Sequence, residues 1–347
     1  MKKIGLIFIA LLSLVSCQKE KLNEGKKIIE LEPPKDQQAE SELDRYLFNK
    51  FTTPYNVIIV YRYDESAFSR NKLQYVTPMS EKKALEIANL IHYMYYEPYS
   101  LNAPKNFMQN YTPKMLVLVG SNAYKPGAGT ALRGLSTGGV KIEMLGLNYV
   151  DPNSTNPQVI KEDIDESILR LLYHESSHIL EQTKLFDPEY QKYSVSDYKG
   201  GLWNKVWRGN DYLKSGFISA YSSDNFHEDF VELLARYIIY YQKDQCGCET
   251  TDVTKDTDGD GLDDTAYSKW KTEIEAKGYI WEEELATAAK GSPTGSNLTG
   301  KDVLLKKLDI VCKYLKNEWK IDLDALRKEI HRRHDLLQTK DFSKYEK

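Results

Sequence analysis

The sequence predicts an α+β fold, with a mixed β-sheet in the N-terminal half and a helical C-terminal half. Short apolar runs typical of strands alternate with an amphipathic helix between residues 55 and 147. Several longer amphipathic segments follow from residue 163 onward. At 347 residues the chain is long enough for one large domain with a smaller appendage.

The N-terminus has the pattern of an export signal. Two lysines precede an apolar run at residues 4–14, which is too short to span a bilayer. The run ends at Leu14-Val15-Ser16-Cys17, which resembles the lipobox of bacterial lipoproteins, where the leader is cleaved before a lipid-bearing Cys. We therefore expect a signal peptide over residues 1–16 and lipid attachment at Cys17. The mature protein would be anchored in the outer membrane, on its periplasmic or surface face.

The first folded elements are predicted after a polar stretch. Residues 17–42, rich in Lys and Glu, predict a flexible tether between the membrane and the folded part. Strands are predicted at residues 55–61, 115–119 and 140–147, and an amphipathic helix at 82–95. We expect the strand at 140–147 to form the edge of the sheet.

A long helix is predicted to begin at Asp163, whose side chain can cap it while Glu166 reaches back three residues later. Its apolar stripe would face the core and consists of Ile164, Ile168, Leu171, Leu172 and Ile179. The Tyr-, Trp- and Gly-rich segment up to residue 220 is expected to be irregular and to shape a binding cleft. Further helices are predicted at residues 225–242, 301–317 and 322–338.

The most informative motif is His174-Glu175-Ser176-Ser177-His178. Residues four apart share one face of a helix, so both imidazoles can bind one metal ion, with Glu175 beside it. The phasing puts Glu175 and His178 near the buried side of the helix, and a metal gives polar groups a reason to be there. A catalytic zinc site takes three protein ligands and leaves one position open, so a third ligand must come from elsewhere.

Glu228 is the predicted third ligand. It opens the stretch Glu228-Asp229-Phe230-Val231-Glu232 at the start of a helix, so Glu232 lies on the same face and can orient a histidine through a hydrogen bond. His227 and Asp224 are the alternatives. His227 and Glu228 are separated by about 100° around the helix, so they cannot both face the same ion.

Together these motifs carry a resemblance to known peptidases. H-E-x-x-H followed by a helix with E-x-x-x-E resembles the gluzincin arrangement, and Tyr221 is similar to the Tyr that precedes the ligand helix in the lethal-factor-like branch of zincins. Residues 215–221 and 228–232 resemble more closely the zinc-binding metallopeptidase lipoproteins of Bacteroidetes. The likeness covers roughly residues 45–245. It implies a zincin-like fold with a catalytic domain over residues 43–245.

The expected activity is hydrolysis of peptide bonds in a peptide or protein substrate. Zn²⁺ would lower the pKa of a bound water and Glu175 would act as the general base. Tyr221 would stabilise the oxyanion if its hydroxyl reaches the site, and the alternative is an aromatic residue of the cleft wall. The alternative is a binding lipoprotein that holds peptide or glycan in an outer-membrane nutrient-uptake complex, with little turnover. The presence of Glu175 argues against it, because binding alone does not need that carboxylate. A structural zinc would need a fourth ligand, which we do not find.

Residues 246–300 form a predicted insertion rich in Cys, Asp and Gly. Oxygen donors at positions 1, 3, 5 and 9 of a calcium loop are supplied by Asp256, Asp258, Asp260 and Asp264. Position 12 is Tyr267 in place of Glu, so a weak Ca²⁺ site and a solvated acidic insertion both stay open. One of Cys246 and Cys248 could pair with Cys312, and the sequence does not choose between them.

The remaining features are peripheral to the metal motif. Residues 301–347 are expected to form C-terminal helices that pack on the catalytic domain. A solvated structural role is expected for His92, His331 and His334, which have basic neighbours or lie on an amphipathic helix. The net charge of −4 shows no excess of basic residues of the kind that nucleic-acid binding requires, so nucleic-acid binding is not expected.

Overall fold

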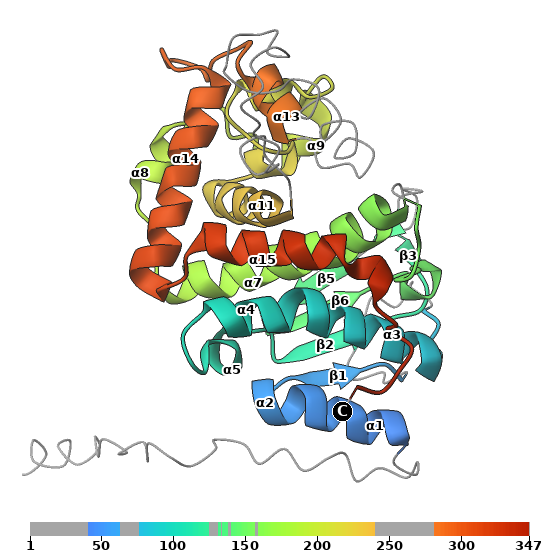
Figure 1. Ribbon diagram of the computed structural model, residues 1–347. Coiled ribbons are helices and arrows are strands. Elements are labelled where there is room, and N and C mark those ends of the chain that lie inside the picture. Colours follow the sequence, from blue (N-terminus) through green and yellow to red (C-terminus); the bar gives the residue numbers. More distant parts are fainter. Residues whose placement is uncertain are drawn as a thin grey trace, which may run out of the picture. The chain divides into compact units, whose positions relative to one another are not determined.

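A four-stranded sheet lies in the N-terminal half of the chain (Figure 1). The structure is a computed structural model that describes residues 41–62, 76–124, 131–132, 134–137, 140–156, 159–239 and 281–346. The strand order is β1-β2-β6-β5. Three strands run parallel, namely β1 (Ile58–Val60), β2 (Met115–Leu118) and β6 (Lys141–Met144). The fourth, β5 (Gly134–Thr137), pairs antiparallel with β6.

The α+β prediction is confirmed, but the predicted edge strand is wrong. β6 lies between β2 and β5, so it is an inner strand of the sheet. The chain turns back before β6 and adds β5 to its outer side, and the short sequence of β5 has no apolar run that would have revealed it. A separate antiparallel pair is formed by β3 (Ala123–Tyr124) and β4 (Ala131–Leu132).

Helices connect β1 to β2, as a parallel pair requires. The predicted helix at 82–95 is α3 (Glu81–Ile91), continued by the wider turn η2 (His92–Tyr96) and by α4 (Glu97–Asn102). Ser80 caps α3, because its side chain accepts a hydrogen bond from the amide of Lys83. Before β1 lie α1 (Glu42–Leu47), η1 (Phe48–Thr52) and α2 (Thr53–Tyr55), and α5 (Phe107–Tyr111) precedes β2.

The main hydrophobic core lies between the sheet and the helices. Leu116 and Leu118 of β2 belong to this core, whereas Val117 belongs to a smaller cluster with Val119 and Leu145. This alternation follows from the two-residue period of a strand, which sends successive side chains to opposite faces. On α3 the expected apolar side is fully buried and includes Ala84, Ile87, Leu90 and Ile91.

The helix that carries the histidine motif begins earlier than predicted. It runs continuously as η4 (Ile160–Leu169) and α7 (Arg170–Thr183), so Asp163 lies inside the helix and does not cap it. Glu166 accepts a hydrogen bond from Arg170 Nε at 2.9 Å instead of reaching back to a cap. The predicted apolar stripe is buried at Ile164, Ile168 and Leu172.

The second half of the described chain is helical. α7 packs against α11 (Phe226–Ile239), and α11 packs in turn against α14 (Gly300–Tyr314) and α15 (Leu323–Asp335), as Figure 1 shows. η9 (Leu315–Trp319) joins α14 to α15, η10 (Leu337–Thr339) follows α15, and α13 (Trp281–Ala288) contacts α14. Between α7 and α11 the chain forms short pieces, namely α8 (Glu189–Lys192), η5 (Gly200–Leu202), α9 (Trp203–Val206), α10 (Asp211–Lys214) and η6 (Tyr221–Ser223).

A buried ion pair fixes α14 to the beginning of α11. Lys307 Nζ lies 2.6 Å from Asp229 Oδ2, and neither side chain is exposed. Tyr198 donates a second hydrogen bond to the same oxygen of Asp229, at 2.9 Å. Lys307 also donates to Ser194 Oγ and to the carbonyl of Gly216. The first turn of α11 is therefore held from outside the helix as well as by its own backbone.

Two histidines near the C-terminus differ from expectation. His331 and His334 are buried, although the sequence suggested a solvated role. His331 Nε2 lies 2.9 Å from the carbonyl of Ile238, and His334 Nε2 lies 2.9 Å from Asp165 Oδ1. The packing of α15 against α11 places these side chains inside the fold, which their basic neighbours in the sequence could not indicate.

Several predicted sites lie outside the described residues. These are the signal peptide and tether, Cys17, Cys246, Cys248, and the aspartates Asp256, Asp258, Asp260 and Asp264. Cys312 is half-buried on α14, and burial raises the pKa of its thiol to about 12. The described residues all belong to one compact unit, Glu40–Lys347. No helix within them is long and apolar enough to cross a membrane.

Candidate metal centre

The two histidines of the motif converge with Glu228. His174 Nε2 lies 3.2 Å from Glu228 Oε2, and His178 Nε2 lies 3.4 Å from the same oxygen. The two imidazole rings stand nearly perpendicular, with centroids 4.9 Å apart. One ligand atom from each of the three residues lies within 4.8 Å of the others. The structure thus brings together the three residues that the sequence suggested as ligands.

Helix capping sets the position of Glu228. The side-chain oxygen of Asn225 accepts hydrogen bonds from the amides of His227 and Glu228, at 2.9 and 3.1 Å. Glu228 therefore lies in the first turn of α11, and the packing of α11 on α7 turns its carboxylate toward the histidines.

Glu232, one turn further along α11, accepts a hydrogen bond from Nδ1 of His174, the ring nitrogen other than the Nε2 that lies near Glu228. Its Oε1 accepts hydrogen bonds from His174 Nδ1 and Arg170 Nη1, both at 2.9 Å. Its Oε2 accepts from Ser219 Oγ at 2.9 Å and from Arg236 Nε at 3.0 Å. Because His174 donates through Nδ1, the lone pair of its neutral ring lies on Nε2, which faces Glu228.

Glu181 contacts Nδ1 of His178, as Glu232 contacts Nδ1 of His174, and this contact was not predicted from the sequence. Glu181 is 2% exposed. Its Oε1 lies 3.3 Å from His178 Nδ1 and its Oε2 lies 2.8 Å from His227 Nδ1. The signal in the sequence was the spacing, because Glu181 follows His178 by three residues on the same helix face.

The two alternative ligands lie elsewhere in this geometry. His227 is bound through Nδ1 to Glu181, and its side chain is 40% exposed. Asp224 accepts a hydrogen bond from the side chain of Asn225 at 2.7 Å. Among the described residues, neither belongs to the cluster formed by the two motif histidines and Glu228.

The charges of this cluster shift its pKa values strongly. Burial alone would raise the pKa of Glu228, but His174 and His178 outweigh it and lower the pKa to about 2. Burial alone would lower the pKa of His178, yet the nearby carboxylates of Glu181 and Glu228 raise it to about 9. The pKa of His174 is raised against burial by Glu228 and Glu232. The site without an ion therefore favours a cation, either a proton or a metal.

The donor set fits zinc in number, chemistry and spacing. Glu228 Oε2 is buried and has no hydrogen-bond partner, although two imidazole nitrogens lie within ion-pair distance. In a tetrahedral site with Zn–N and Zn–O bonds of about 2.0–2.2 Å, neighbouring ligand atoms are about 3.3–3.5 Å apart. The observed separations of 3.2 and 3.4 Å are close to that spacing. An ion between the three atoms would satisfy the orphaned oxygen.

Glu175 and Tyr221 flank the cluster. Glu175 follows His174 directly on α7 and is half-buried. The ring of Tyr221 lies nearly parallel to that of His174, with centroids 5.9 Å apart, and Trp203 contacts Tyr221 edge-on with ring centroids 5.0 Å apart. Burial and then the negative charge of Glu228 raise the pKa of Tyr221, so its hydroxyl keeps its proton at neutral pH.

A second group of possible ligand atoms fits a metal poorly. His92, Glu97 and Glu346 also lie within 4.8 Å of one another. However, Arg333 pairs with Glu97 and Lys50 pairs with Glu346, so both carboxylates already have a cationic partner. A divalent ion would have to displace these partners.

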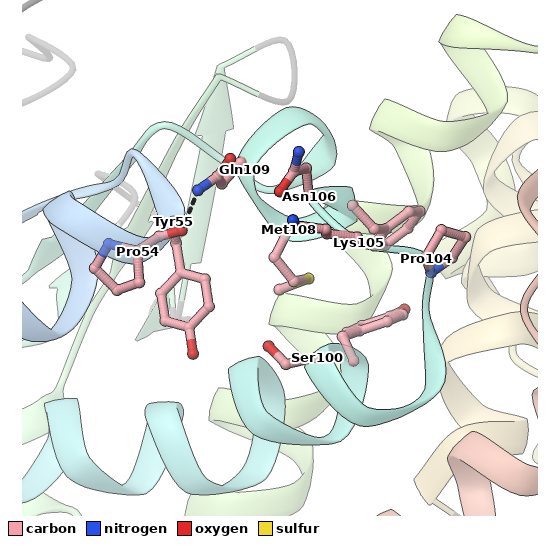
Figure 2. Close-up of a pocket in the computed structure, with 10 residues that line it drawn as sticks. Pro54, Tyr55, Ser100, Pro104, Lys105, Asn106, Met108 and Gln109 are labelled. Atoms are coloured by element: carbon pink, nitrogen blue, oxygen red, sulfur yellow. Dashed lines mark hydrogen bonds between the residues drawn. The ribbon is translucent and has the colours of Figure 1, made fainter. Parts of the chain in front are cut away.

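Figure 2 shows a separate pocket of about 220 Å³. It is formed by residues of α2, α4, α5 and the segment between α4 and α5, and the side chain of Gln109 donates a hydrogen bond to the carbonyl of Pro54 at one end of it, at 2.8 Å. None of the three clustered residues lines it. The candidate site is therefore defined by its donor atoms rather than by this cavity.

Comparison with known proteins agrees with the geometry. A family model described as "Putative zinc-binding metallo-peptidase" matches residues 35–324. A crystal structure titled as a putative zinc-binding metallo-peptidase from Bacteroides caccae matches with a TM-score of 0.60 and 21% identity, covering 90% of this chain and 99% of that one. At this identity the likeness shows the fold alone. No curated protein matches the chain. Because the family match spans most of the sequence, this protein belongs to the family of putative zinc-binding metallo-peptidases.

Proposed function

We propose that the protein is a zinc-dependent peptidase with a zincin-like fold, and that His174, His178 and Glu228 hold the metal. The observation that carries this proposal is the position of Glu228 Oε2, buried and orphaned 3.2 and 3.4 Å from the two Nε2 atoms. The family match supports the same metal and the same class of reaction.

Three protein ligands leave a position open, which distinguishes a catalytic zinc from a structural one. When bound, zinc supplies Lewis acidity and lowers the pKa of coordinated water to about 7. Glu232 and Glu181 keep the two imidazoles in the tautomer that presents Nε2 to the metal. The orientation of the site is therefore fixed before substrate arrives.

The remaining residues move protons and stabilise charge. Glu175, beside His174, would accept the proton of the attacking water and return it to the leaving amine. Tyr221 keeps its hydroxyl proton and lies against His174, so it can donate a hydrogen bond to the oxyanion of the attacked carbonyl. Neither residue needs to bind the metal for these roles.

We further propose that the enzyme is an exported lipoprotein, attached to the outer membrane through Cys17. The lipobox-like sequence before Cys17 supports this location. The expected substrate is a peptide or protein encountered on the periplasmic or surface face. Labelling with a fatty acid in cells, with Cys17→Ala as the comparison, tests the anchor.

The test of the catalytic proposal is Glu175→Gln. This variant should keep its zinc by metal analysis, because Glu175 is not among the three clustered residues. Its turnover of mixed peptide substrates should fall by about 10²- to 10⁴-fold, the usual contribution of a general base. Glu189→Gln makes the same chemical change at an exposed position on α8 and should leave turnover unaltered. Equal turnover in Glu175→Gln and native protein would remove Glu175 from the mechanism.

A further inference from the structure

We propose that Trp203, Leu202 and Val206 form an apolar wall that selects substrates with a bulky apolar or aromatic side chain close to the scissile bond. This inference rests on the proposed peptidase function and adds the substrate class. The wall consists of the ends of η5 and α9, the short helices before α10. No wall of this kind was predicted beyond the general expectation that the region shapes a cleft.

Aromatic contacts link Trp203, through Tyr221, to the proposed metal ligand His174. Tyr221 stacks on His174 at 5.9 Å, and Trp203 meets Tyr221 edge-on at 5.0 Å. An extended peptide advances about 3.3 Å per residue, so these spacings place Trp203 one to three residues from the bond being cleaved. The side chain of that substrate residue is the group that Trp203 can contact.

Hydrogen bonds at both ends hold the segment in place. The amides of Lys199 and Gly200 donate to the carbonyls of Ser223 and Asp224, at 2.6 and 3.1 Å. At the other end, Trp207 Nε1 donates to Ser223 Oγ at 2.8 Å. Hydrogen bonds therefore join both ends of the segment to η6 and its C-terminal cap, next to Tyr221, and residues 201–206 lie between these attachments in the chain.

Two apolar side chains of this segment are exposed, alongside the polar Asn204 and Lys205. Leu202 is 56% exposed and Val206 is 44% exposed, while Trp203 is half-buried against Tyr221. Contact between a substrate side chain and these exposed apolar groups removes apolar surface from water and is therefore favourable. Their attachment to the turn beside His174 makes a bound substrate the occupant that the geometry favours.

The experiment measures binding, so it does not depend on turnover. Zinc-loaded Glu175→Gln protein is titrated with a series of alanine-rich octapeptides in which one Phe is moved through the central positions. At one or more positions the Phe peptide should bind about 10- to 100-fold more tightly than the all-alanine peptide, the range expected for filling an apolar site. Adding Trp203→Ala should reduce that preference to less than about threefold.

Two further variants separate the wall from general damage. Leu202→Ser changes an exposed side chain, so it should fold normally and still weaken the Phe preference by several fold. Leu305→Ala, at an exposed apolar position on α14, should leave the preference intact. A flat Phe series, or a preference that survives both Trp203→Ala and Leu202→Ser, overturns the wall. Failure of native enzyme to cleave any peptide would instead overturn the peptidase proposal, while the binding series would still report on the wall.

Discussion

Replacing Glu181 with glutamine tests the support around the metal ligands. The carboxylate of Glu181 contacts Nδ1 of His178, and the carboxylate of Glu232 contacts Nδ1 of His174. Loss of such a partner commonly lowers metal affinity by about 10- to 100-fold. The change keeps the shape of the side chain but removes the charge that holds the imidazole, so it isolates the electrostatic contribution.

The structure indicates where in that range each variant should fall. The Glu181–His178 contact is 3.3 Å long, and Glu181 divides its oxygens between His178 and His227. The Glu232–His174 contact is 2.9 Å long and belongs to a carboxylate that is 1% exposed. We therefore expect a loss of about tenfold, or 1.4 kcal/mol, for Glu181→Gln and about a hundredfold for Glu232→Gln.

The assay is competition between the protein and a zinc chelator of known affinity, followed by metal analysis. Glu189→Gln, at an exposed position on α8, is the matched control and should bind zinc like the native protein. Activity of Glu181→Gln should recover at saturating zinc, because the catalytic residues are unchanged. If Glu181→Gln binds zinc within twofold of native protein, or loses more affinity than Glu232→Gln, the assignment of these supporting roles is wrong.

Two other predictions concern stability. Lys307→Met should lower the free energy of unfolding in urea by about 3–5 kcal/mol, because it leaves the wholly buried Asp229 without its cation; adding Asp229→Asn should restore part of the loss. A cost below about 1 kcal/mol would contradict this account. Burial alone would raise the pKa of Glu97, but His92 and Arg333 lower it to about 2, so its stabilisation is present above the usual value of 4.5 and is lost as pH falls toward 2. Glu97→Gln should therefore lower the free energy of unfolding by about 1–2 kcal/mol at neutral pH. This loss is smaller than the full pKa shift implies, because the side chain of Glu97 is 34% exposed. In acid-unfolding curves the difference in stability between this variant and the native protein should vanish near pH 2.

Local patterns predicted the helices better than the sheet. The amphipathic runs that became α3, α11, α14 and α15 were visible because helical burial repeats every three to four residues. The inner position of β6 in the sheet was not visible in the sequence, because strand order depends on which segment adds to the edge of the sheet. β5 contains only four residues and no apolar run, so its addition beside β6 left no mark in the sequence.

The part of the candidate site that depends on spacing within a single helix was predicted from the sequence. Spacing within one helix placed His174 and His178 on one face, and phasing within another placed Glu228 and Glu232 on one face. The contacts of Glu181 with His227 and of Trp203 with Tyr221 could not be predicted, because each joins side chains from different elements. Glu181 contacts His227 of α11, and Trp203 contacts Tyr221 of η6.

The sequence by itself determined the chemistry that is available: two imidazoles and one carboxylate within a helix, followed by a second helix that carries Glu228 and Glu232 near its start. The family membership also follows from it. Only the tertiary structure decided that Glu228 Oε2 meets both Nε2 atoms, that His227 turns to Glu181, and that β6 is an inner strand. Periodicity fixes which face of a helix a residue occupies, whereas the packing of α7 against α11 fixes what that face meets.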